Sequence, residues 1–297
     1  MLVPGDVRTV DNIASQFRGR PASVLLVEDP TQPGARSQFS CPFLSTTHGH
    51  ESLLGWIRLE QSELAAYARR AVALLRRPLQ PELPILLLGP REPRYRQLLD
   101  EMEQVASRSS TAAVFRWSAD RITRRALGSA LRTGAGALLY TGHGNATGWF
   151  AYGGVNSSAL TGDTPWAHDE TTGIAFSLSC RAGADPPLMD NVDRRLCRGL
   201  SDQLVACGAA GVVFAPAADS LHADTRVLAQ LLTQALADGQ RSCRDVLDAA
   251  RSAGSSLGGY VVIGDPGLRA AAAPGAAGRC RLATSSYDVT AADVCDG

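Results

Sequence analysis

Short apolar runs, each ended by turn residues, recur along the chain and predict buried β-strands. They cover residues 24–27 (VLLV), 85–88 (ILLL), 137–140 (ALLY), 174–178 (IAFSL), 212–214 (VVF) and 260–263 (YVVI). Between them, apolar residues recur at the spacing of one helix face. These helical patterns span residues 61–76, 95–106, 122–131, 196–207, 225–236 and 243–253. Strands that alternate with helices of this length predict an α/β fold, in which helices cover both faces of a mostly parallel sheet.

Changes in composition divide the chain into three predicted parts. Regular prolines in residues 77–84 (RPLQPELP) are typical of a linker. This linker would separate a smaller N-terminal α/β subdomain, residues 1–80, from a larger subdomain, residues 81–270. Residues 271–297 are rich in alanine and glycine and have little periodicity, so we expect a loosely packed C-terminal tail.

Charge and cysteine content narrow the classes of function. The 29 basic residues, all arginine, balance 29 acidic ones, so no global charge favours nucleic acid or an anionic membrane as a partner. The first residues lack a signal-peptide pattern and no apolar run is long enough to span a bilayer, so we expect a cytoplasmic protein. Seven cysteines without CxxC or zinc-ligand spacing indicate free thiols and no metal or other cofactor.

Two consecutive predicted strands end in side chains that carry chemistry. One run leads into Thr141-Gly142-His143-Gly144, and the next leads into Ser179-Cys180-Arg181. Ligands of an open parallel sheet bind beyond the carboxyl ends of its strands, so the imidazole and the thiol would share a crevice if the strands are neighbours. A thiol needs a nearby base to react as thiolate, and histidine suits that task. The alternative is a buried cysteine and a histidine in an ordinary turn.

Motifs around both residues resemble those of clan CD cysteine peptidases, the group of caspases, metacaspases, legumain, separase, gingipains and CHAT-domain peptidases. GALLYTGHG at 136–144 and SLSCRAG at 177–183 resemble the His-Gly and Cys motifs of the clan. Further similar segments, nearest to the gingipain-type and CHAT branches, are GWIRLEQSELAAYARRAVALL, LCRGLSDQLVACGAAGVVFAPA and YVVIGDPGLR. Each motif is weak alone, but their order and spacing over most of residues 54–270 make the resemblance specific.

The resemblance implies a caspase-like sheet and peptide hydrolysis through an acyl-enzyme. His143 would be the base and Cys180 the nucleophile, with the backbone amides of Gly144 and Cys180 as the oxyanion hole. The substrate would be a protein or peptide. Gingipains carry a leader and a propeptide that this sequence does not show, which favours an intracellular bacterial defence role with a gasdermin-like or sensor partner. Two alternatives stay open: a non-catalytic caspase-like interaction module, and an enzyme that acts on small esters or amides.

The resemblance also implies that an acidic residue could set the substrate specificity. Many clan members bind a basic P1 side chain through an acidic residue, and Asp219 follows the predicted strand at 212–214 in a loop that some relatives use. The alternative is that Asp219 or Ser220 caps the next helix. Asp29 and Asp185 are weaker candidates for the same pocket.

Three other features have competing interpretations. His48-Gly49-His50-Glu51 lacks the spacing of a helical zinc site and is better read as a loop. Arg194-Arg195, after the predicted nucleophile, would be an activation cut site or part of a solvated loop. Trp149 and Trp166 would line a substrate cleft or belong to the core.

Overall fold

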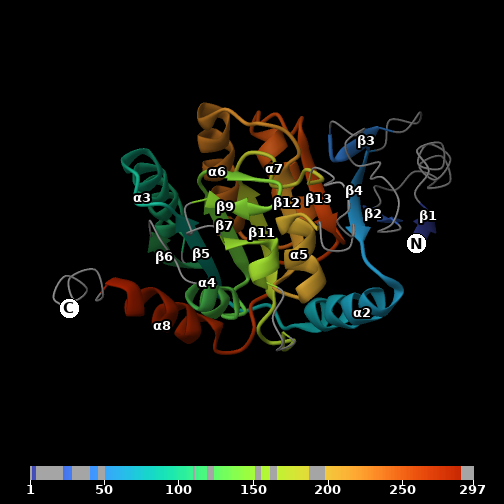
Figure 1. Ribbon diagram of the computed structural model, residues 1–297. Helices are drawn as coiled ribbons and strands as arrows, with labels where there is room; N and C mark the ends of the chain where they lie inside the picture. Colours follow the sequence, from blue (N-terminus) through green and yellow to red (C-terminus); the bar gives the residue numbers. More distant parts are fainter. Residues whose placement is uncertain are drawn as a thin grey trace.

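The computed structural model describes residues 2–4, 23–28, 41–45, 51–109, 111–118, 124–150, 155–160, 166–186 and 198–288. Its centre is a ten-stranded sheet of order β1-β2-β4-β13-β12-β11-β7-β5-β6, with β3 paired to β4 (Figure 1). The strands are β1 (Leu2–Pro4), β2 (Ser23–Glu28), β3 (Phe43–Ser45), β4 (Glu51–Arg58), β5 (Leu83–Gly89), β6 (Ala112–Ser118), β7 (Ala137–Thr141), β11 (Thr172–Leu178), β12 (Ala210–Pro216) and β13 (Tyr260–Gly264). A small antiparallel sheet comprises β8 (Gly144–Asn145), β9 (Gly148–Trp149) and β10 (Val155–Asn156), and the 3-10 helix η3 (Ser157–Leu160) follows it.

The large sheet consists of two parallel blocks that run in opposite directions. Strands β12, β11, β7, β5 and β6 are parallel to one another, as are β1, β2, β4 and β13. The blocks meet at the antiparallel pair β12–β13. The carboxyl ends of β5, β7, β11 and β12 therefore lie at one edge of the sheet, where ligands of such folds bind.

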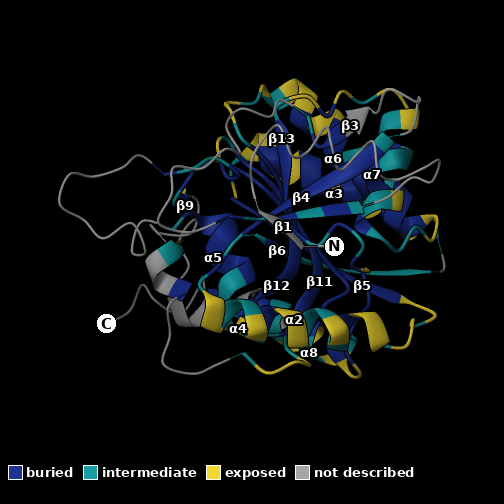
Figure 2. Ribbon diagram, turned by 90° about the vertical axis from the view of Figure 1, so that its right-hand side faces the viewer, coloured by how far each residue is buried: buried dark blue, intermediate teal, exposed yellow. Residues whose placement is uncertain are grey.

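Helices cover both faces of the sheet, as Figures 1 and 2 show. One face packs against α3 (Pro93–Ser107), α6 (His222–Ala237) and α7 (Cys243–Ser252). The other packs against α4 (Arg124–Leu131), α5 (Leu200–Cys207) and α8 (Ala276–Asp288), and α2 (Gln61–Arg76) lies across the lower edge. None of the helices in the described part of the chain is long and apolar enough to cross a bilayer.

Local sequence explains where these elements form. Every residue of β5, β7, β11, β12 and β13 is buried, which is why each reads as an unbroken apolar run. Pro93 opens α3, where its missing N–H costs nothing, and the Ser242 side chain caps α7 by accepting from the Asp245 amide. The predicted fold class, a mostly parallel sheet between two layers of helices, is confirmed.

The first part of the predicted tail, as far as Cys280, is packed against the body of the protein. Ala271, Ala272 and Ala273 are buried, and α8 follows them along the lower edge of the sheet. Arg279 fixes this segment by donating to the carbonyls of Thr133 and Asp169 at 2.9 and 3.1 Å. Alanine is the best helix former and packs closely, so it builds a docked segment without strong periodicity.

The predicted linker is likewise tied to the body of the protein. The Arg77 guanidinium donates to the carbonyls of Thr171 at 2.7 Å and Ala271 at 3.0 Å, and also to that of His168. Leu83, which the pattern placed in the linker, begins β5. Because β4 pairs with both β2 and β13, one continuous sheet spans the boundary at residue 80, and the division into two subdomains stays a prediction.

Candidate active site

The two predicted dyad residues follow matched positions on neighbouring strands. Strands β7 and β11 are parallel, and Thr141 is the register partner of Leu178. His143 and Cys180 each lie two residues beyond this pair, at the carboxyl edge of the sheet. The topology thus brings the imidazole and the thiol to one edge, as the strand pattern predicted.

A buried aromatic layer supports the turn that carries His143. The Tyr140 hydroxyl donates to the His143 carbonyl at 2.8 Å, and the Tyr140 ring stacks on Trp149 with centroids 4.3 Å apart. Trp149 in turn donates from Nε1 to Ser177 Oγ at 2.8 Å. Trp149 is therefore a core residue beneath the turn, and the cleft-wall interpretation is wrong.

The glycines on both sides of His143 are required by close packing. A Cβ on Gly144 would lie 2.5 Å from Ser179 Oγ and 2.9 Å from the Gly148 carbonyl. A Cβ on Gly142 would overlap the Tyr140 hydroxyl. The backbone that carries His143 is thereby pressed against the residue before Cys180, which keeps the Gly144 and Cys180 segments adjacent.

The thiol of Cys180 lies half-buried in a polar setting. Its Sγ lies 3.7 Å from the Ser220 carbonyl and 3.9 Å from Ser220 Oγ. The next residue, Arg181, has φ 55° and donates its amide to the Ala218 carbonyl at 3.1 Å. Among the described residues, the Cys180 amide has no hydrogen-bond partner, so this N–H is available to a bound oxyanion.

Three other described thiols have raised pKa values because they are removed from water. Burial raises the pKa of Cys207 to about 11 and also raises the pKa values of Cys243 and Cys280. These thiols are protonated at neutral pH and face the core, so they are poor nucleophiles.

The imidazole of His143 contacts two side chains that the sequence analysis did not identify. Its Nε2 lies 2.5 Å from Nη2 of Arg94 and 3.5 Å from Oε2 of Glu92, and these two residues pair with each other at 2.7 Å. A guanidinium only donates, so its contact requires unprotonated Nε2, whereas the carboxylate requires an Nε2–H. Arg94 and Glu92 therefore compete to set the tautomer of His143.

The other ring nitrogen of His143, Nδ1, faces no hydrogen-bond partner among the described residues. Within the described part of the chain, Nδ1 makes no hydrogen bond, and none joins His143 to Cys180. Catalytic hydrogen bonds are often long in free enzymes and shorten on substrate binding, so this separation is compatible with a dyad.

An aromatic ring lies between two histidines at this edge. Tyr95 makes edge contacts with His143 and His222, at centroid distances of 5.4 and 5.3 Å. Burial, followed by the charges of Arg94 and Arg226, lowers the pKa of His222, so this ring is neutral at neutral pH. Strand β5 is parallel to β7 and ends at Gly89, just before Glu92, at the same edge of the sheet. The position of Glu92 and Arg94 after a predicted strand could therefore have marked them as candidate site residues.

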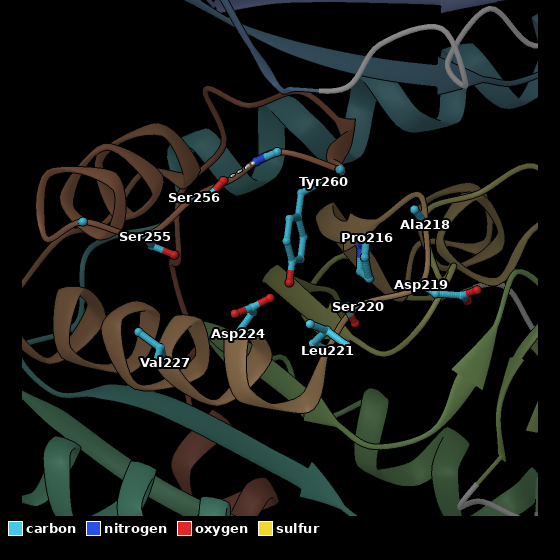
Figure 3. A pocket seen from close by; sticks show the side chains of 13 residues that line it. Pro216, Ala218, Asp219, Ser220, Leu221, Asp224, Val227, Ser255, Ser256 and Tyr260 are labelled. Carbon is cyan, nitrogen blue, oxygen red and sulfur yellow. Dashed lines mark hydrogen bonds between the residues drawn. The ribbon is translucent and has the colours of Figure 1, made fainter.

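A cavity of about 400 Å³ lies beside the thiol. Ser220 lines this cavity and also contacts Cys180. Figure 3 shows the Asp224 carboxylate and the Tyr260 hydroxyl facing each other across this cavity, whereas Asp219 points away from them. Asp219 instead forms a two-bond ion pair with Arg181, at 3.0 and 3.1 Å, with 68% and 61% of the two side chains exposed.

The helix-cap interpretation of Asp219 and Ser220 is wrong. Helix α6 begins at His222 and its N-cap is Leu221, without a side-chain cap. Asp219 also lines a second cavity, of about 880 Å³, together with Arg181, Asp185 and the hairpin residues 145–147. The Arg181–Asp219 pair thus stands between two cavities.

Several other predicted features lie outside the described residues, namely Asp29, His48, His50 and Arg194-Arg195. Glu51 is described and pairs with Arg251. The Arg132 guanidinium packs over the ring of Trp166, with its Cζ 4.2 Å from the ring centroid. No group of three or more potential metal ligands occurs in the described part of the chain.

Two solved structures have a similar fold. The crystal structure of the Arg-specific cysteine proteinase gingipain R (RGPB) matches with a TM-score of 0.67 at 16% identity, over 89% of this chain and 68% of that one. A complex of the Porphyromonas gingivalis RgpB pro- and mature domains matches with a TM-score of 0.64 at 16% identity, over 89% and 70%. No curated protein matches the chain.

The family model of peptidase family C25 matches residues 92–271, which is more than half of the 297 residues. The matched region contains β7, β11 and both predicted dyad residues. The chain therefore belongs to peptidase family C25, the gingipain family of clan CD, and is a cysteine peptidase.

Proposed function

We propose that this protein is an endopeptidase in which Cys180 is the nucleophile and His143 the general base. The observation that carries this proposal is the matched placement of both residues beyond Thr141 and Leu178 on adjacent parallel strands. Membership of a cysteine peptidase family supplies the reaction class.

In the proposed reaction, Cys180 gives its proton to His143 and its sulfur attacks the scissile carbonyl carbon. The oxyanion that forms would accept from the amides of Cys180 and Gly144. Collapse breaks the C–N bond, and the imidazolium returns the proton to the leaving amine. Water, deprotonated by His143, then hydrolyses the acyl-enzyme and releases the second product.

Glu92 would orient the base. When the Glu92 carboxylate accepts from Nε2–H of His143, the Nδ1 lone pair is available for the thiol proton. When Arg94 donates to Nε2, neutral His143 carries its proton on Nδ1 and cannot accept another there. The productive arrangement is therefore the one in which Glu92 displaces Arg94 from Nε2.

The proposed substrate preference is a basic P1 residue, and the cavity beside the thiol supports Asp224 more strongly than Asp219 as its partner. Asp224 points into this cavity opposite Tyr260, whereas Asp219 is already paired with Arg181 at its rim (Figure 3). A guanidinium and a carboxylate form two parallel hydrogen bonds, which fits an arginine side chain. The matched gingipain R is described as Arg-specific.

The wider biology stays a prediction. A cytoplasmic location, a CHAT-like defence role and a gasdermin-like or sensor partner were expected from the sequence, and the site geometry supports a protein or peptide substrate of any origin.

A peptide library diversified at P1, with products identified by mass spectrometry, tests the proposal. We expect wild type to cleave after arginine or lysine, Cys180→Ala to cleave nothing, and Asp224→Asn to lose the basic preference. Asp219→Asn is the matched control, because it removes a neighbouring carboxylate that precedes α6, and it should retain that preference. Cleavage by Cys180→Ala would show that Cys180 is not the nucleophile. An unchanged P1 preference in Asp224→Asn would exclude Asp224 from P1 binding.

A further inference from the structure

Three partly buried charges connect the turn after Cys180 to the N-terminal strands. Arg58, the last residue of β4, donates to Asp185 Oδ1 and to Glu28 Oε2, each at 3.0 Å. Exposed fractions of 15% for Arg58, 8% for Glu28 and 24% for Asp185 show that this cluster is partly buried. Glu28 is also the register partner of Arg58 at the end of β2. One cation thus bridges two strand ends to the loop that leaves the nucleophile.

A second ion pair joins the same region of the chain to α5. Arg198, just before α5, makes two hydrogen bonds of 2.7 Å to Glu63 in the first turn of α2. The Glu60 amide also donates to Glu63 at 2.9 Å, which fixes the carboxylate on the helix. The β4–α2 connection, defined as residues 58–63, is visible at the right of Figure 1. It binds Asp185 through Arg58 and Arg198 through Glu63.

Both contacts lead to the nucleophile turn through short chains of hydrogen bonds. The turn is tight, since the Ala182 amide donates to the Ser179 carbonyl at 3.2 Å and the Ala184 amide to Arg181 at 2.9 Å. From α5, Ser201 Oγ donates to the Ala182 carbonyl at 2.7 Å. A shift of Asp185 or of α5 would therefore move the backbone that carries Cys180.

We propose that the β4–α2 connection positions the catalytic nucleophile, with Arg58 acting through Asp185 and Glu63 acting through Arg198. Both are positioning residues, because neither touches the thiol. They lie before residues 92–271, the part that matches the family, so the family match assigns them no role. The inference rests on the proposed function of Cys180 and makes the end of β4 and the start of α2 a support of the active site.

The charge balance gives Arg58 the larger share of this effect. Without its guanidinium, Glu28 and Asp185 would each lose an ion pair at a partly buried site. Asp185 would move toward water and carry the turn with it. The planar guanidinium holds two carboxylates at once, whereas a lysine ammonium in the same place would hold one of them.

The test compares Arg58→Met with Arg132→Met in the full-length chain. Arg132 pairs with Glu170, with 26% and 28% of the two side chains exposed, on the segments that lead into β7 and β11, and so controls for the loss of an ion pair alone. Measurements are the rate of Cys180 alkylation by iodoacetamide, kcat and KM on an arginyl peptide, and the unfolding midpoint. Because misplacement of a reacting group by about 1 Å costs roughly a hundredfold in rate, we expect Arg58→Met to lower kcat about tenfold to a hundredfold.

Further expected results separate positioning from stability. Arg58→Met should leave KM nearly unchanged and alter the alkylation rate, while Arg132→Met keeps both rates despite a similar loss of stability. Arg58→Lys should recover part of kcat. In the Arg58→Met/Asp185→Asn double variant, the effects should be less than additive because both act through one contact.

Equal alkylation rates and equal kcat in folded Arg58→Met and Arg132→Met would overturn the inference. Alkylation needs only the thiol, so it compares the variants even if wild type cleaves no peptide, an outcome that would count against the proposed function instead. A change in alkylation rate confined to Arg58→Met supports the positioning role in either case.

Discussion

The floor and the rim of the candidate site are built from opposite kinds of contact. The floor, defined as Tyr140, Gly144, Trp149, Ser177 and Ser179, consists of residues packed at the carboxyl ends of β7 and β11 and in the hairpin beside them. The rim, defined as Glu92, Arg94, Arg181, Asp219 and Asp224, consists of charged side chains exposed to water.

This difference assigns separate tasks to the two regions. Buried contacts lock the floor into one arrangement, so it fixes the backbone that presents His143 and the oxyanion amides. Exposed ion pairs are worth only about 0–1 kcal/mol each, so substrate can exchange them at little cost. The floor should therefore govern whether catalysis occurs, and the rim should govern protonation and substrate choice.

The largest expected effect comes from a single methyl group added to the floor. Gly144→Ala places a Cβ 2.5 Å from Ser179 Oγ and should lower kcat by roughly a hundredfold, because the oxyanion amides move. Gly128→Ala, in α4, is the matched control, since its Cβ would meet nothing within 4 Å. Kinetics and circular dichroism on both variants would check this, and equal kcat values would contradict a rigid floor.

A rim change that alters the tautomer of His143 should have the next largest effect. Glu92→Gln preserves shape but offers a weaker acceptor to Nε2–H, so we expect a loss in kcat of about tenfold to a hundredfold. The pH dependence of kcat/KM should change as well. A variant with wild-type kcat and pH profile would show that Glu92 does not orient the base.

The neighbouring rim cation should have a smaller effect of opposite sign. Arg94→Met removes the donor that competes with Glu92 for Nε2, and we expect kcat/KM at neutral pH to rise a few-fold. Steady-state kinetics at low salt, where exposed charges are least screened, gives the most sensitive comparison. A large loss of activity would mean that Arg94 assists the reaction instead.

The smallest expected effect concerns the free energy of unfolding and the ion pair of Glu63 in α2. Burial alone would raise the pKa of Glu63, but hydrogen bonds from Arg198 and the Glu60 amide hold it below the ordinary 4.5. A lowered carboxyl pKa stabilises the fold above the ordinary value, and this gain is lost as pH falls through the lowered pKa. Glu63→Gln should therefore cost less than about 1 kcal/mol near neutrality, with the difference shrinking below pH ~4 in denaturant titrations. A difference that does not depend on pH would contradict the assignment.

The core strands could be predicted because they are apolar throughout. Strands β5, β7, β11, β12 and β13 lie between two helix layers, so burial alone marks them in the sequence. Strand β6 was missed because its apolar run at 112–115 is half-buried, alanine-rich and followed directly by Arg116, so it is a weak strand signal. Strand β4, Glu51–Arg58, was missed because its residues from Gly55 onward were assigned to the segment leading into α2.

At the site, sequence order predicts which strand ends meet but not which way side chains point. His143 and Cys180 follow consecutive predicted strands, so their proximity follows from topology. Glu92 and Arg94 lie in a charged stretch before the predicted helix at 95–106, whereas in the structure Glu92 is the N-cap of α3 and Arg94 lies in its first turn. Asp219 and Asp224 flank the start of α6, and only the backbone path decides which carboxylate faces the cavity.

The central claim is that Cys180 reacts as a nucleophile activated by His143. Its most direct test is peptide mapping by mass spectrometry after treatment with an arginyl acyloxymethyl ketone. The account predicts one adduct, on Cys180, that is absent in Cys180→Ala and strongly slowed in His143→Ala, with buried Cys243 unmodified. An adduct on another thiol, or labelling at the same rate in His143→Ala, would contradict it.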